Sequence, residues 1–148
     1  MRRLAAMIGI VVISIAYSPV RAQQTFTRSV WDGVYTEQQA RRGEPKYKEH
    51  CALCHGDHLE GDEEDPPLAG ALFLTNWDGL PLGSLFVRIR RDMPLNWKVG
   101  KLNPEVCADI LAYMLSVNGF PQGNADLSHA AEVLNQIRFE SAKPGAKQ

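Results

Sequence analysis

Residues 51 to 55 read Cys51-Ala52-Leu53-Cys54-His55, two thiols three positions apart followed directly by an imidazole. At this spacing both thiols can bond to one flat ring system while the adjacent histidine turns its ring nitrogen toward the centre of that ring. Cys-x-x-Cys-His is the attachment pattern of haem c, in which the thiols add to two vinyl groups. We therefore expect one haem c, covalently held by Cys51 and Cys54, with His55 as an iron ligand.

Two other chemistries use closely spaced cysteines. A structural zinc ion needs four ligands, and the remaining candidates His50, His58, Cys107 and His129 show no zinc-like pairing. A redox-active disulfide of the thioredoxin kind is typical of alternating strands and helices. The sequence has no such alternation, so haem attachment is the favoured interpretation.

A haem that transfers electrons is usually held by a second axial ligand. Beyond the amino-terminal segment the methionines are Met93 and Met114. Met114 lies in a strongly helical segment, whereas Met93 precedes a proline in an irregular stretch, 38 residues after His55. We expect Met93 to be the second iron ligand. His58 is too close to His55 to reach the opposite face of the ring, and His129 lies in the tail.

The first 22 residues are typical of an export signal. Met1-Arg2-Arg3 is a basic start, an apolar stretch of 14 residues follows, and Val20-Arg21-Ala22 matches a signal-peptidase site. The apolar stretch is shorter than the roughly 17 to 25 residues that a membrane-spanning helix needs. We expect cleavage after Ala22, a periplasmic product, and no membrane span in the mature chain.

Length and charge limit the class of protein. The 148 residues provide for one domain with tails. A net charge of −1 gives no electrostatic reason to expect a nucleic-acid partner. We expect a signal peptide over 1–22, a lead-in over 23–33, a folded domain over 34–120, and an extension over 121–148 with a weak helix and a flexible end. The extension could pack on the domain, bind a partner or fray. Its apolar positions are Leu127, Ala131, Leu134 and Ile137.

Helical patterns predict an all-α domain. Thr36-Glu37-Gln38-Gln39 fits a capping box, so a first helix should begin there, with a kink or a late start near residues 41–45, where a proline removes a hydrogen bond. An apolar stripe over 82–89 predicts a second helix that ends before the Met-Pro pair. The third helix should run from an asparagine cap to a glycine, over 103–119. Residues 57–80, rich in Pro, Gly and acids, are expected to be loop.

The chain resembles a class I c-type cytochrome, a small helical electron carrier. The resemblance spans Val34 to Phe120 and rests on the haem motif, Pro66-Pro67-Leu68-Ala69-Gly70, Met93-Pro94 and Ala108-Asp109-Ile110-Leu111-Ala112-Tyr113-Met114. It implies a cytochrome c-like fold of about three core helices wrapped around one haem, with the first and last helices crossing near Gly43 and Tyr113. It also implies that the carbonyl of Pro66, or alternatively of Pro67, accepts a hydrogen bond from the non-ligating nitrogen of His55.

Further side chains are expected around the haem. Trp77 and Trp97 either hydrogen-bond a haem propionate through the indole N–H or simply wall the crevice. Cys107 is expected to be a small buried apolar residue rather than half of an intermolecular disulfide or a reactive thiol. An apolar lining should raise the reduction potential, because a low dielectric disfavours the extra positive charge of ferric iron. The residues expected to line the pocket are Leu68, Phe73, Leu85, Phe86, Ile89 and Ile110.

We expect a periplasmic one-electron carrier rather than an enzyme, either free or a subunit of a larger oxidoreductase. It would meet a redox donor and acceptor transiently, and the haem-attachment machinery during maturation. The alternatives are a haem enzyme or gas sensor with an open iron site, if Met93 does not bind, and a disulfide oxidoreductase without haem. Two charged groups could steer a partner or be solvated surface. They are the acidic run Asp57, Glu60, Asp62, Glu63, Glu64 and Asp65 and the basic group Arg88, Arg90, Arg91, Lys98 and Lys101.

Overall fold

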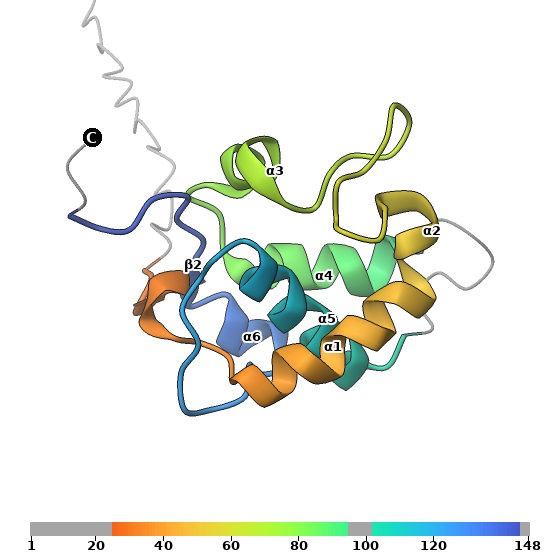
Figure 1. Ribbon diagram of the computed structural model, residues 1–148. Coiled ribbons are helices and arrows are strands. Elements are labelled where there is room, and N and C mark those ends of the chain that lie inside the picture. Colours follow the sequence, from red (N-terminus) through yellow and green to blue (C-terminus); the bar gives the residue numbers. More distant parts are fainter. Residues whose placement is uncertain (1–24, 95–101, 146–148) are drawn as a thin grey trace, which may run out of the picture.

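The computed structural model describes residues 25–94 and 102–145, which are mostly helical (Figure 1). The expected all-α class is confirmed. The expected signal peptide and Trp97, Lys98 and Lys101 lie outside the described residues. In chain order the elements are β1 (Arg28–Ser29), the 3-10 turn η1 (Val30–Asp32), α1 (Glu37–His50), α2 (Ala52–His55), α3 (Gly70–Trp77), α4 (Leu82–Asp92), α5 (Pro104–Val117), α6 (Ala131–Leu134) and β2 (Ile137–Arg138).

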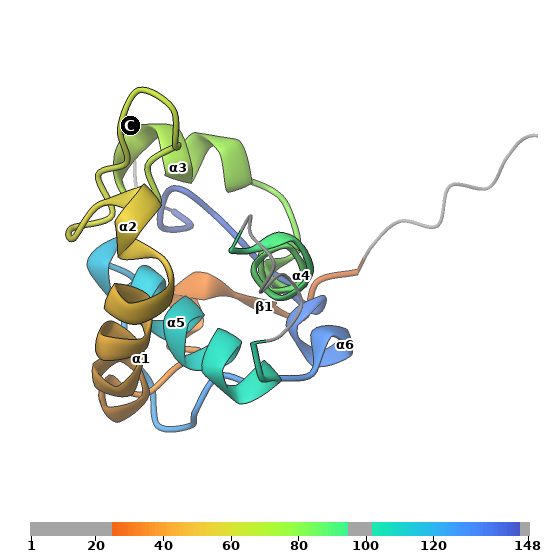
Figure 2. The same cartoon turned by 90° about the vertical axis from the view of Figure 1, so that its right-hand side faces the viewer.

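Helices α1 and α5 pack closely against each other, as both views of the ribbon show (Figures 1 and 2). A Cβ atom on Gly43 would lie 1.9 Å from the carbonyl oxygen of Asp109 and 2.9 Å from the Cβ of Tyr113. Such an approach is open only to a residue without a side chain. The predicted crossing of the first and last core helices near Gly43 and Tyr113 is confirmed.

Helix α1 begins where the Thr36 cap predicts, without the late start that Pro45 suggested. Thr36 caps the helix, accepting a 3.1 Å hydrogen bond from the N–H of Gln39, and the helix then continues through Pro45 to His50. Pro45 and Arg41, whose carbonyl loses its helical partner, are both exposed, so water can satisfy that carbonyl. Packing against α5 stabilises the turn that propensity alone disfavours. The expected late start is therefore wrong.

Helix α3 lies in the stretch that was expected to be loop, so that expectation is wrong for residues 70–77. The first half of this stretch, 57–69, is rich in prolines and acids and is non-helical after Gly56. The apolar run Ala71-Leu72-Phe73-Leu74 then forms a helix that turns Phe73 inward, where its side chain is buried. Averaging composition over the whole stretch hides this short amphipathic helix. Helices α4 and α5 match the expected second and third helices.

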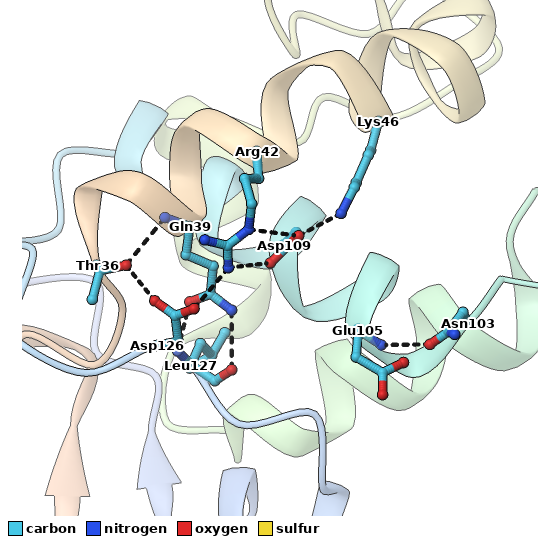
Figure 3. Close-up of polar contacts among 9 residues, drawn as sticks. All are labelled: Thr36, Gln39, Arg42, Lys46, Asn103, Glu105, Asp109, Asp126 and Leu127. Carbon is cyan, nitrogen blue, oxygen red and sulfur yellow. Dashed lines mark hydrogen bonds and ion pairs between the residues drawn. The ribbon is translucent and has the colours of Figure 1, made fainter.

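Polar contacts tie α1 to α5 and to the carboxyl-terminal segment (Figure 3). Asp109 on α5 accepts hydrogen bonds from Arg42 and Lys46 on α1. The buried Gln39 amide donates to the Leu127 carbonyl at 3.0 Å and accepts from the Leu127 N–H at 2.5 Å. The two bonds between Gln39 and Leu127 anchor the segment after α5 to the domain.

The carboxyl-terminal segment packs back on the domain over the described residues. Leu127, Leu134 and Ile137 are buried, and β2 pairs in parallel with β1. The helix in this segment covers only Ala131–Leu134, so Leu127 lies before it and Ile137 in the strand after it. Across the described residues, no helix is both long enough and apolar enough to cross a membrane.

Candidate functional site

A cavity of about 430 Å³ lies among α2, α3, α4 and α5. Its volume falls within the roughly 300–1,000 Å³ of ligand and cofactor sites. Its lining includes Cys51, Cys54 and His55 of the motif, together with Met93, which lies 38 positions after His55. They are the residues that the sequence predicts for covalent attachment of a haem and for ligation of its iron. The structure brings them to one cavity; attachment and ligation stay predictions.

The imidazole of His55 is held by one hydrogen bond. His55 is the last residue of α2 and its side chain is buried. Its Nδ1 atom lies 2.8 Å from the carbonyl oxygen of Pro66. Because a carbonyl oxygen only accepts, Nδ1 is the donor, and in the neutral imidazole this leaves the lone pair on Nε2. This is the arrangement of a metal-ligating histidine, and it confirms the predicted contact with Pro66 rather than Pro67.

The pKa values of the two motif thiols differ in direction from those of redox-active cysteines. Cys51, Cys54 and Cys107 are all free. Burial raises the pKa of the Cys51 thiol to about 12. The Asp65 carboxylate beside Cys54 raises the pKa of that thiol as well. Reactive cysteines instead have lowered pKa values in electropositive surroundings, so the direction of both shifts does not favour a dithiol oxidoreductase.

A zinc site finds no support either. Within residues 25–94 and 102–145, no three His, Cys, Asp or Glu side chains gather closely enough to hold a metal ion. His58 and His129, weighed as alternative iron ligands, do not line the cavity. A haem iron, in contrast, needs only one ligand from each face of the ring, which His55 and a thioether can supply.

Two thioethers reach the cavity. Met93 follows the last residue of α4 with an extended backbone, and its side chain is half-buried. Met114 lies inside α5 and is 1% exposed, as part of the packed core. Sequence reasoning set Met114 aside as helical and did not foresee that it also lines the cavity. Met93 is the less tightly packed of the two and the freer to ligate.

The wall of the cavity is largely apolar, as predicted. One residue that was predicted to line the cavity, Phe86, does not do so, although it is fully buried. Consecutive residues on a helix point about 100° apart, so when Leu85 and Ile89 face the cavity Phe86 points into the core. Trp77 also lines the cavity. The other expected apolar residues that line it are Leu68, Phe73, Leu85, Ile89 and Ile110.

Sequence reasoning missed several residues of this cavity, most of them polar or at its rim. Arg88 on α4 could have been found, because it is three positions after Leu85 on the same helical stripe. The others carry no periodic signal. The residues that were not foreseen are His50, Leu53, Asp65, Pro67, Asn76, Leu80, Arg88, Pro94 and Met114.

The charges around the cavity are uneven. Asp65, at the end of the acidic run, and Arg88, at the start of the basic group, both line it. Arg88, Arg90 and Arg91 are exposed on α4. The donor set, the apolar wall and the volume together fit a covalently attached haem, with charged side chains where the cavity meets solvent.

Comparison with known proteins agrees with this site. Residues 38–114, just over half of the chain, match the family described as cytochrome c oxidase, cbb3-type, subunit III. The crystal structure of the sulfane dehydrogenase SoxCD from Paracoccus pantotrophus contains a chain of similar fold. The two chains share 21% sequence identity and a TM-score of 0.52, over 90% of this chain and 72% of that one. No curated protein sequence matches.

A cytochrome c domain carries a covalently bound haem c, and the match covers the Cys51–His55 motif, the Pro66 loop and Met93. The likeness to SoxCD shows the same helical fold. The chain therefore belongs to the family of the cbb3-type cytochrome c oxidase subunit III and is a class I c-type cytochrome, a haem-based electron-transfer domain.

Proposed function

We propose that the protein is a periplasmic one-electron carrier with a single haem c, held by Cys51 and Cys54 and ligated by His55 and Met93. One observation carries the proposal: a single cavity collects these four side chains, and a hydrogen bond to Pro66 already orients the imidazole. When bound there, haem supplies a one-electron couple between ferrous and ferric iron.

The residues of the chain hold this group and tune it. The Pro66 carbonyl fixes the ring orientation of His55 and makes Nε2 a stronger ligand. Phe73, Leu85 and Ile89 exclude water from the cavity. A dry, apolar surrounding disfavours the extra charge of the oxidised state, and a thioether ligand acts in the same direction. We therefore expect a raised reduction potential.

Redox partners would dock transiently, over less than about 1,200 Å² of buried surface, because a carrier must leave quickly. Acidic residues 57–65 and the arginines of α4 are the groups that would steer the encounter. The same site suits the electron-transfer subunit of a larger oxidoreductase. The amino-terminal pattern supports export to the periplasm, where attachment machinery would add the haem.

The test is expression of the full chain in a bacterium that has haem-attachment machinery, followed by periplasmic fractionation. The mature protein should start at Gln23, carry the mass of one haem, and give a pyridine haemochrome spectrum with both vinyls saturated. Cys51→Ala or Cys54→Ala should remove one thioether, whereas the control Cys107→Ala should keep both. A colourless protein with reversible oxidation of Cys51 and Cys54 would contradict the proposal.

Carbon monoxide separates a carrier from an enzyme or a gas sensor. If Met93 occupies the second axial position, the reduced protein should bind carbon monoxide slowly or not at all at neutral pH. Rapid, stoichiometric binding of carbon monoxide would show an open iron site. The protein would then be a haem enzyme or a gas sensor rather than a carrier.

A further inference from the structure

The corner between α3 and α4, residues 78–81, joins two walls of the cavity. Trp77 at the end of α3 and Leu80 within the corner line the cavity, and Leu85 on α4 continues the same wall. At its other end α3 is tied to α5, because the Gly70 N–H donates to the side-chain oxygen of Asn118 at 3.1 Å. Over the described residues, no other helix packs its backbone extensively along α3. The corner is therefore important for the placement of α3.

A carboxyl-terminal strap, which we define as residues 135–141, runs beside this corner (Figure 1). The Gly79 N–H donates to the Phe139 carbonyl at 2.8 Å, and the Phe139 N–H donates to the Leu80 carbonyl at 2.8 Å. The Ser141 N–H donates to the Asp78 carboxylate, also at 2.8 Å. Each end of the corner is thus bonded to the strap.

The strap is fixed from two further sides. A Cβ on Gly83 of α4 would lie 2.2 Å from the side-chain oxygen of Asn135, so this turn of α4 and the strap are in direct contact. On the other side, the Thr27 N–H donates to the Gln136 carbonyl at 3.0 Å, next to the β1–β2 pairing. The strap therefore links the amino-terminal lead-in to the corner.

Phe139 is the side chain through which the strap reaches the cavity wall. It is fully buried and packs edge-on against Phe73, with ring centroids 5.8 Å apart, and against Phe120 at 5.2 Å. Phe73 lies 6.4 Å from Trp77, and both of these rings line the cavity whereas Phe139 does not. Phe139 thus packs directly against Phe73, which in turn neighbours Trp77 on the α3 wall.

We propose that the strap positions the α3 wall of the haem cavity, with Phe139 acting as a positioning residue through Phe73 and Trp77. Without the ring of Phe139, Phe73 loses a packing partner and Trp77 is held less firmly through Phe73, so water gains access to this side of the cavity. Wetter surroundings stabilise the more charged oxidised state and so lower the reduction potential. This inference rests on the proposed haem-carrier function.

The test compares full-length holoprotein variants by covalent haem content and by midpoint potential. Phe139→Ala should keep its haem and shift the potential to a lower value, and Phe139→Leu should restore part of the shift. Leu127→Ala is the matched control: Leu127 is also buried in the carboxyl-terminal segment, but its main chain bonds to Gln39 of α1, not to the corner. It should lower stability and leave the potential unchanged.

An unchanged potential in Phe139→Ala, or an equal shift in Leu127→Ala, would overturn the positioning role. If Phe139→Ala does not fold, Phe139→Leu carries the same comparison with Leu127→Ala. A wild-type protein without covalent haem would refute the proposed function itself, and with it this inference. If the wild type carries covalent haem and Phe139→Ala has an unchanged midpoint potential, only the positioning role of the strap is refuted.

Discussion

The backbones of Gly43 and Asp109 touch where α1 crosses α5, since a Cβ on Gly43 would lie 1.9 Å from the Asp109 carbonyl oxygen. Gly43→Ala should force the two helices apart and destabilise the fold by about 1–3 kcal/mol or more, as overpacked cores do. Urea unfolding measures this change. Gly119→Ala is the control, because a Cβ there meets open space and costs only about 1–2 kcal/mol of left-handed strain. A loss below about 1 kcal/mol in Gly43→Ala would show that the crossing tolerates a methyl group.

Asp109→Asn should destabilise the same crossing through its charge. The Asp109 carboxylate is 7% exposed and bonds to Arg42 at 3.2 Å and to Lys46 at 2.5 Å. A hydrogen bond to a charged group contributes about 1.5–3 kcal/mol, and the partial exposure of both cations places the expected loss at the lower end. Glu37→Gln removes the exposed pair with Arg41 and should change unfolding by less than about 1 kcal/mol. Indistinguishable effects of the two substitutions would contradict this ranking.

Asp126 should contribute acid-sensitive stability. The Thr36 hydroxyl and the Arg42 guanidinium lower the pKa of Asp126 below its ordinary value of 3.8. A lowered folded-state pKa means that the stabilisation is present above the unfolded pKa and is lost as the pH falls through the folded pKa. Between about pH 5 and pH 3, the wild type should lose more unfolding free energy than Asp126→Asn. Parallel pH profiles from chemical denaturation would exclude this contribution.

Cys107 should be structural rather than reactive. Its side chain is 0% exposed, and burial raises its pKa to about 11. Holoprotein should therefore migrate as a monomer without reductant, and thiol reagents should leave Cys107 unmodified until the protein unfolds. A disulfide-linked dimer that Cys107→Ala abolishes would contradict this. The same substitution should cost about 1 kcal/mol through the lost side-chain volume.

Local sequence patterns were sufficient to predict much of the fold and of the site. The capping residues Thr36 and Asn103 begin α1 and α5, and the Leu82–Ile89 stripe marks α4, because caps and apolar periodicity act within a few residues. The hydrogen bond between His55 and Pro66 followed from the family resemblance and is present.

Features that depend on distant contacts were not predictable in the same way. Helix α3 is short and is preceded by a proline-rich, acidic stretch, so its pattern was lost in the average. The strap reaches the α3–α4 corner through bonds between residues about 60 positions apart, such as Asp78 and Ser141, and no local pattern encodes them. Met114 lines the cavity because α5 crosses behind it, which is a property of tertiary packing.

The most direct test of the account replaces each thioether of the cavity in turn and measures carbon monoxide binding to the reduced holoprotein. Met93→Ala should bind carbon monoxide rapidly and stoichiometrically, and its reduction potential should be lower than that of the wild type. Both effects are expected because the substitution removes the proposed second iron ligand. Met114→Ala, which removes the other thioether that lines the cavity, should stay slow or unreactive like the wild type. A Met93→Ala protein with the wild-type spectrum, potential and slow binding would contradict the account.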